Sequence, residues 1–189
     1  MIVFDIIGPK EVKSEGLSEP LLDQLLVTKP LTHRNEGENL DLSGEQPVLS
    51  GSFNPGNGWQ ERKFDQPVTG RYVCLEALSA QDGKDLACIA EMYLLDENGE
   101  RLSREPWIAN YADSEDVSHV NCSADKIFDL QESTYWSTTK DTPYPHSVVI
   151  DLGSTRTLTG IQYLPRMESE VPGGIKDFKV YVKSKAFNY

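Results

Sequence analysis

The sequence predicts an all-β protein, built as an antiparallel β-sandwich. The clearest strand is FKVYV, in which the apolar side chains of Phe178, Val180 and Val182 share one face, as in a half-buried strand with a period of two. Four further stretches are equally rich in β-branched and aromatic residues: RYVCLEAL (71–78), CIAEMYLL (88–95), HSVVIDL (146–152) and LTGIQYL (158–164). Many short strands at this spacing are typical of a sandwich or barrel.

Turn-forming residues bound these strands. The turns are DENGE (96–100), with Asn98-Gly99 as a hairpin signal, QDGK (81–84), DLGS (151–154) and VPGG (171–174). One stretch has a helical pattern, SEPLLDQLLV (18–27), where Ser18 is a candidate N-cap, Pro20 lies in the first turn and four leucines form a stripe. A helix of at most three turns does not change the predicted fold class.

Length and charge limit the organisation and the partners of the chain. The 189 residues suffice for one domain of ordinary size plus about forty further residues. We therefore expect an extension or linker to a preceding domain over residues 1–43 and the sandwich over residues 44–189. Thirty Asp and Glu against 18 Lys and Arg give a formal charge of -12, which repels polyanions and argues against nucleic acid as a partner.

The sequence contains no apolar run long enough to predict a membrane span. Its first residues, MIVFDIIGPK, lack the basic segment and the long apolar segment of a signal peptide. The protein is then either cytosolic or a piece of a longer exported chain, and we favour the second interpretation.

The three cysteines do not form a recognisable framework. Cys74, Cys88 and Cys122 are odd in number and lack the CxxC spacing of a zinc site. A bridge between Cys74 and Cys88 on neighbouring strands is one alternative. The favoured alternative is that they are small apolar side chains packed in strands.

Several motifs resemble a known family. FDLQESTYW, PHSVVIDLGS, TGIQYLPR and GGIKDFKVYV, within residues 125–183, resemble the N-terminal half of the discoidin domain, also called the coagulation factor V/VIII type C domain, and especially carbohydrate-binding module family 32. GEQPVLSGSF, KFDQPVTGRYVCLEAL and LACIAEMYLLD, within residues 44–96, resemble the C-terminal half of the same domain. The resemblance implies a galactose-binding-like jelly roll.

The two halves occur in reversed order along the chain. This order fits either the tail of one module followed by a truncated second module, or a single circularly permuted module. The halves together supply one complete set of strands, and domain termini often lie close enough to be joined, so we favour permutation. Residues 97–124 would then connect the original ends.

The stretch ADKIFDLQESTYW (124–136) is compatible with an acidic catalytic loop, a metal-binding loop or ordinary turn chemistry. A glycosidase-like site needs a second carboxylate across the substrate, and no residue is paired in that way. The resemblance implies a structural calcium instead, bound through oxygens of Lys126, Asp129, Gln131, Thr134, Ala90 and Glu91. Leu130 stands where the family usually has Gly. The simpler alternative is that Asp129 caps the turn and Glu91 is solvated.

The sequence does not predict an enzyme. His33, His119 and His146 lack the HExxH spacing of a metal site, and no Ser or Cys occupies a GxSxG elbow. For His146 we expect a packed, hydrogen-bonded side chain at the head of a strand.

The resemblance implies binding of terminal sugars such as galactose, N-acetylgalactosamine and N-acetylglucosamine, through loops at one end of the sandwich. Such a site needs an aromatic face and a few polar groups. The candidates for sugar contacts are Trp107, Tyr111, Tyr144, Arg166, Glu168 and Trp59. Trp107 and Arg166 have packing roles as alternatives.

The resemblance also implies a biological setting. Discoidin-like modules follow the catalytic domain in exported glycoside hydrolases, such as chitobiase-like β-N-acetylhexosaminidases of gut Bacteroidetes. We therefore predict a non-catalytic carbohydrate-binding module of such an enzyme, extracellular or periplasmic, with calcium as a structural ion. The main alternative is a structural or protein-docking domain that does not bind sugar.

Overall fold

The computed structural model describes residues 39–140, 142–168 and 170–189. In these residues it contains only strands, loops and one short 3-10 helix, which confirms the predicted all-β class. The predicted helix at Ser18–Val27, His33 and most of the expected extension at 1–43 lie outside the described residues. The elements are β1 (Leu49–Ser52), β2 (Gln60–Ala77), β3 (Cys88–Ile89), β4 (Glu91–Leu95), β5 (Ile108–Ala112), η1 (Ala124–Phe128), β6 (Trp136–Ser137), β7 (His146–Leu164) and β8 (Asp177–Lys183).

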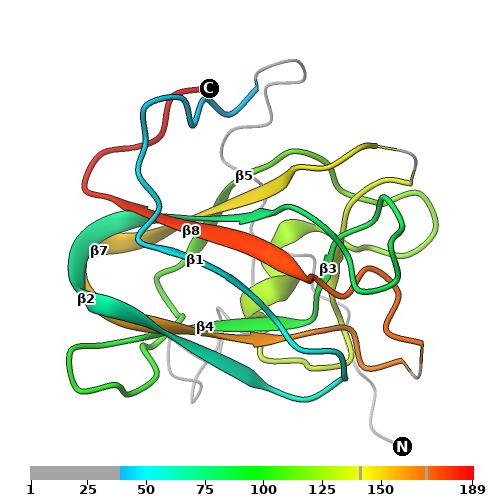
Figure 1. Ribbon diagram of the computed structural model, residues 1–189, viewed down its shortest axis with the longest axis horizontal. Helices are drawn as coiled ribbons and strands as arrows, with labels where there is room; N and C mark the ends of the chain where they lie inside the picture. The colour runs from blue at the N-terminus through cyan, green and yellow to red at the C-terminus, as the bar shows by residue number, and fades with distance from the viewer. Residues whose placement is uncertain (1–38, 141, 169) are drawn as a thin grey trace, which may run out of the picture.

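Two long, bent strands build both layers of the sandwich (Figure 1). In the first layer, the second half of β2 pairs with β8 and with the first half of β7, while β1 continues the sheet beyond β8 and β5 beyond β7. In the second layer, the first half of β2 pairs with the second half of β7, and β4 pairs with the other edge of β7. All of these pairs are antiparallel.

The structure corrects the prediction of two separate strands at 146–152 and 158–164. They form the single strand β7, and the DLGS stretch bends it without ending it. Pairing with β2 continues through the bend, for example between Thr69 and Thr157. Gly153 has a φ of +77°, and a Cβ there would lie 3.1 Å from Pro106, so glycine allows the close approach of the 102–107 segment.

The other predicted strands and turns are present, with one interruption. CIAEMYLL divides at Ala90, because Cys88 and Ile89 pair with β6 whereas Glu91 and the residues after it pair with β7. The DENGE turn is closed by a hydrogen bond from the Gly99 N–H to the Asp96 carbonyl at 3.0 Å. The turns at QDGK and VPGG are also present.

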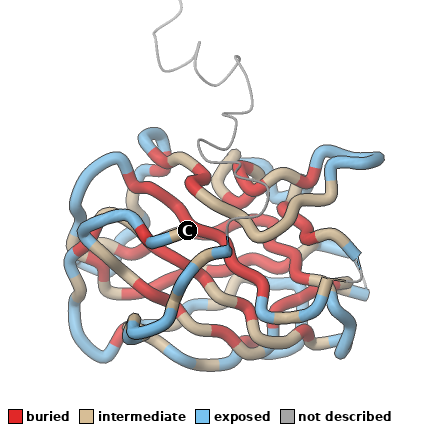
Figure 2. Tube along the Cα trace, turned by 90° about the horizontal axis from the view of Figure 1, so that it is seen from above, coloured by how far each residue is buried: buried red, intermediate tan, exposed pale blue. Residues whose placement is uncertain are grey.

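The main core lies between the two layers, and Figure 2 shows buried residues concentrated along the strands in the middle of the molecule. Trp107 and Trp136 are its largest fully buried side chains. A smaller cluster on the outer face of the first layer contains Cys74 and Phe187. Cys74, Cys88 and Cys122 are all buried and free, so the interpretation as apolar fillers is confirmed and the bridge is not formed.

Strands from the two family-like stretches alternate within the sheet. β8, from the downstream stretch, lies between β1 and β2 of the upstream stretch, and β7 lies between β2 and β4. The two stretches therefore form one sandwich with a shared core. In the part of the chain that the structure describes, no helix has the length and apolar character needed to cross a membrane.

Candidate functional site

The turn after η1 contains the carboxylate expected to bind calcium. Asp129 Oδ1 accepts a hydrogen bond from the Gln131 backbone N–H at 2.9 Å, and Oδ2 accepts one from the Thr134 hydroxyl at 2.7 Å. Lys126 Nζ lies 3.5 Å from the same Oδ2. Asp129 therefore shapes this turn through its own side chain, as the turn-capping alternative requires.

Glu91, the other expected carboxylate, starts β4 and is only 1% exposed, so the alternative of a solvated Glu91 is wrong. Its Oε2 forms an ion pair with Arg104 Nη1. Arg104 Nη1 also donates to the Met92 carbonyl at 3.1 Å, and Nη2 donates to the Tyr93 hydroxyl at 2.8 Å. The Arg104 guanidinium is thus held on three sides, and it fixes one oxygen of Glu91.

Glu91 lies close to the Asp129 turn, because β4 packs against η1. Burial raises the pKa of Glu91 to about 7, the Arg104 guanidinium opposes this rise, and the neighbouring Asp129 carboxylate adds to it. Two carboxylates that are distant in sequence are therefore close enough to repel each other electrostatically. Such a pair favours a cation between or beside its members.

The second carboxylate oxygen of Glu91, Oε1, bears on whether these residues fit calcium. Oε1 is buried and has no hydrogen-bond partner among the described residues. A buried acceptor without a partner is costly, and a hard cation would compensate for it. The side chains of Glu91 and Asp129, the hydroxyl of Thr134 and nearby backbone carbonyls provide the oxygen ligands that calcium prefers, so the residues present fit the ion.

Among the described residues, no three His, Cys, Asp or Glu side chains gather as a metal cluster. The expected calcium ligands are compatible with this observation, because the set contains two carboxylates and takes its other oxygens mainly from the backbone. Leu130, the residue that departs from the family pattern, adopts a backbone conformation typical of glycine. Leu130 has a φ of +67°, the left-handed conformation that glycine adopts at lower cost, and its side chain is 61% exposed.

A stack of aromatic rings and cations lies next to Glu91. The Arg104 Cζ lies 3.7 Å from the centroid of the Tyr93 ring, and the Arg101 Cζ lies 4.1 Å from it. Arg101 also lies 4.6 Å from the Trp59 ring, and Trp59 Nε1 donates to Glu132 at 3.1 Å. Trp59, a sugar candidate, is therefore half-buried and already in contact with a guanidinium.

A second arginine cluster forms after β7, at the end of the sandwich opposite the bend of that strand (Figure 1). Arg166 pairs with Glu168, and its Cζ lies 4.0 Å from the centroid of the Tyr135 ring. The side chains of Arg166 and Glu168 are 20% and 54% exposed. Arg166 Nε has no hydrogen-bond partner within the described part of the chain. This cluster presents a donor, an acceptor and an aromatic ring near solvent.

Sequence comparison finds that part of the chain matches a known domain. Residues 110–189 match the F5/8 type C domain. A sialidase of Micromonospora viridifaciens is 36% identical over 73 residues, which cover 36% of this chain and 11% of the sialidase. A galactose oxidase of Gibberella zeae is 26% identical over 91 residues, which cover 48% of this chain and 13% of the oxidase. The matched stretches thus span little more than a tenth of either relative.

The F5/8 type C region contains Asp129, Arg166 and Glu168, whereas Glu91 and Arg104 lie upstream of it. Both carboxylates of the expected calcium site are nevertheless brought together by the packing of β4 on η1. Within the F5/8 type C region, His146 is fully buried and its Nδ1 lies 2.7 Å from Asp113 Oδ2, so the predicted packing of this histidine is confirmed.

The other aromatic sugar candidates do not meet at one surface. Trp107 is 1% exposed and its ring lies edge-on to Phe128, so its ring faces are not available for stacking. Tyr111 stacks on Tyr189, with the two ring centroids 5.1 Å apart. The Tyr144 hydroxyl donates to the Leu86 carbonyl at 2.6 Å. Of the six candidates, Arg166 and Glu168 are in direct contact.

Sequence reasoning missed two residues of these clusters. No motif in the sequence indicates Arg104, although the hairpin signal at Asn98-Gly99 implies that the chain after the turn returns along β4. Tyr135, in the F5/8 type C region, adjoins a strand and gave no separate signal. Its contact with Arg166 joins residues that are distant in sequence.

Proposed function

We propose that this protein is a non-catalytic carbohydrate-binding module, and that it binds a terminal sugar at the cluster of Arg166, Glu168 and Tyr135. The observation that carries the proposal is the partly exposed Arg166–Glu168 pair against the Tyr135 ring. The guanidinium donates to sugar hydroxyls, the carboxylate accepts from them, and the aromatic ring edge contacts the sugar carbons. Neutral sugars such as galactose, N-acetylgalactosamine and N-acetylglucosamine offer this combination of groups.

The comparisons support a sugar as the ligand. The matched relatives are a sialidase and a galactose oxidase, whose names refer to sugars. We infer that the module belongs to a longer exported glycoside hydrolase, extracellular or periplasmic, with a chitobiase-like β-N-acetylhexosaminidase as the specific candidate. The catalytic domain of that enzyme would be its partner within the chain.

We further propose that the chain is one circularly permuted module. The support is the alternation of strands, with β8 between β1 and β2 and with β7 between β2 and β4. Two fragments of separate modules would each leave half of this core exposed. In a permuted module, the segment from 97 to 124 joins the original ends.

Calcium is part of the proposal as a structural ion. Lys126, Asp129, Gln131, Thr134, Ala90 and Glu91 would hold it through the oxygens described above. An ion that binds only the folded state stabilises that state by mass action. The unpartnered Glu91 Oε1 supports this assignment.

Sugar binding is tested by retention of the protein on immobilised galactose, N-acetylgalactosamine and N-acetylglucosamine, and by binding to a glycan array. We expect Arg166→Met and Glu168→Gln to lose retention while the chain stays folded. Arg101→Met, which removes a guanidinium beside a different aromatic ring, is the matched control and should keep it. Failure of the unaltered protein to bind any glycan at millimolar concentration would support the protein-docking alternative.

Calcium binding is tested separately by thermal unfolding with EDTA or with excess calcium. We expect calcium to raise the Tm of the unaltered protein, and Asp129→Asn to abolish most of the increase. Asp65→Asn, an exposed carboxylate on β2, should retain the increase. Equal melting temperatures in EDTA and calcium would refute the metal assignment without affecting the sugar proposal.

A further inference from the structure

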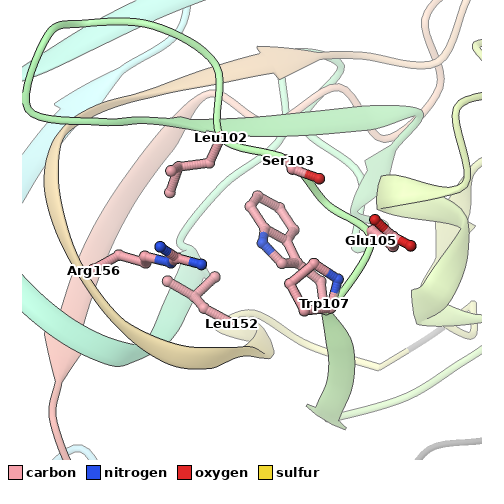
Figure 3. A pocket seen from close by; sticks show the side chains of 7 residues that line it. Leu102, Ser103, Glu105, Trp107, Leu152 and Arg156 are labelled. Atoms are coloured by element: carbon pink, nitrogen blue, oxygen red, sulfur yellow. The ribbon is translucent and has the colours of Figure 1, made fainter.

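A cavity of about 540 Å³ opens between the 102–107 segment and the bend of β7. Leu102 and Leu152 form apolar walls, and Trp107 and Arg156 also line the cavity (Figure 3). Arg156 lies in the bend of β7, whereas Arg166 follows the other end of that strand, so the cavity and the proposed sugar site lie at opposite ends of the sandwich (Figure 1). The volume is in the range of small-molecule sites.

Two hydrogen-bond donors face each other across this cavity. Figure 3 shows the Arg156 guanidinium extending toward the side of Trp107 that carries the indole nitrogen. Neither side chain can accept a hydrogen bond at these nitrogens, so they cannot satisfy one another. Within residues 39–140, 142–168 and 170–189, Arg156 forms no ion pair and Trp107 Nε1 donates no hydrogen bond. The two donors therefore converge without an acceptor between them.

The residues around the two donors indicate which kind of ligand the cavity fits. Trp107 is 1% exposed, so too little of its ring faces is accessible for a sugar to stack on them, and Figure 3 shows its indole nitrogen on the side toward Arg156. Glu105 also lines the cavity but lies on the far side of Trp107 from Arg156 (Figure 3). The cavity therefore offers two donors and apolar walls. A carboxylate attached to an apolar group matches them, since its two oxygens can accept from both donors at once.

We propose that this cavity binds the carboxylate group of a small organic acid. Arg156 and the Trp107 indole N–H donate to the two carboxylate oxygens, and the carbon skeleton of the acid packs between Leu102 and Leu152. The net charge of -12 opposes any anion at long range, but charges farther than about 8 Å are largely screened at physiological salt. Arg156 is the nearby charge that decides the preference. The carboxylate can come from a free aliphatic acid or from a sugar acid.

Titration followed by NMR tests this proposal. Sodium glucuronate, sodium butyrate and neutral glucose are added to the folded chain at constant ionic strength, and the three tryptophan indole N–H resonances are observed. We expect the Trp107 resonance to shift with an acid and not with glucose, while those of Trp59 and Trp136 stay in place. A shift with both acids identifies the carboxylate as sufficient, and a shift with glucuronate alone identifies a sugar acid.

Variants separate the role of Arg156 from general electrostatics. Because Arg156 is exposed, Arg156→Gln should fold normally and weaken binding of the acid roughly tenfold, the loss expected for one charge-assisted hydrogen bond. Lys63→Gln removes one exposed positive charge from β2 and should leave the affinity unchanged. The proposal is overturned if no acid shifts the Trp107 resonance at millimolar concentration, if glucose shifts it equally, or if Arg156→Gln binds as well as the unaltered protein.

Discussion

The same three residue types meet twice in this protein, once in the interior and once near solvent. In the interior, Arg104 pairs with Glu91 and lies 3.7 Å from the Tyr93 ring centroid. Near solvent, Arg166 pairs with Glu168 and lies 4.0 Å from the Tyr135 ring centroid. The side chains of the first ion pair are 3% and 1% exposed, and those of the second are 20% and 54% exposed.

Burial gives the two clusters different roles. Arg104 has further hydrogen bonds to Met92 and Tyr93, so its removal would leave a buried carboxylate without its cation. The Glu168 side chain is 54% exposed, so the pair can open and exchange partners at little cost. The inner cluster therefore stabilises the fold, and the outer cluster, where we propose the sugar site, contributes less to stability.

The largest difference between the clusters should follow from removing the two guanidinium groups. Arg104→Met should lower the free energy of unfolding by about 3 to 5 kcal/mol, because the buried Glu91 carboxyl loses its cation and its pKa, already raised to about 7, rises further. Arg166→Met, the matched change, should cost less than about 1 kcal/mol. Urea unfolding at neutral pH measures both. Similar losses for the two variants would show that burial does not separate the clusters.

Removing the tyrosine hydroxyls, at Tyr93 and Tyr135, should give a smaller difference in stability between the two clusters. Tyr93→Phe removes the acceptor of the hydrogen bond from Arg104 Nη2 and should cost about 1 to 2 kcal/mol, because a buried charged donor loses its partner. In Tyr135→Phe the lost hydroxyl is beside the Cys122 thiol, a weak hydrogen-bond partner, and the loss should be smaller. Chemical denaturation measures the free energy of unfolding of both variants. A larger loss for Tyr135→Phe than for Tyr93→Phe would contradict this expectation.

In the turn beside the inner cluster, one substitution should increase the stability of the protein. Leu130→Gly should raise the free energy of unfolding by about 0.5 to 1 kcal/mol, since release of left-handed strain exceeds the entropy that glycine adds to the unfolded chain. Val120→Gly, at an exposed residue outside the left-handed region, should lower it. A loss of stability in Leu130→Gly would show that the Leu130 side chain contributes contacts that outweigh the strain.

The smallest effect on stability is expected at the outer carboxylate. Glu168→Gln should change the free energy of unfolding by less than about 0.5 kcal/mol, because Glu168 is 54% exposed and water screens its ion pair. The same variant should nevertheless lose retention on the sugar columns. Unfolding curves and column retention measured on one preparation test both parts, and unchanged retention would remove Glu168 from the proposed sugar site.

Local patterns in the sequence were sufficient for the individual strands. FKVYV predicted β8 from its alternation, and the turns at DENGE and VPGG were located from their turn-forming residues. The continuity of β7 could not be predicted in the same way. DLGS has the composition of a turn, but β2 bends alongside it and keeps the strand paired, which is a long-range effect.

The candidate site was predictable only in part. The family motifs led to Asp129, Glu91, Arg166 and Glu168. Arg104 was within reach, because the hairpin closed at Gly99 pairs Leu95 with Arg101 and so returns Arg104 to the start of β4. The placement of Trp107 and Arg156 at one cavity was not predictable, because neither residue carries a motif and their placement depends on the bend of β7.

The path of β7 through both layers also has a consequence for how the protein unfolds. The first half of β7 is hydrogen-bonded between β2 and β5, and the second half between β2 and β4. Neither layer can detach without breaking pairs on a strand that belongs to the other. The two layers therefore form one cooperative unit, and amide hydrogens along β7 should exchange with solvent only when the whole sandwich opens.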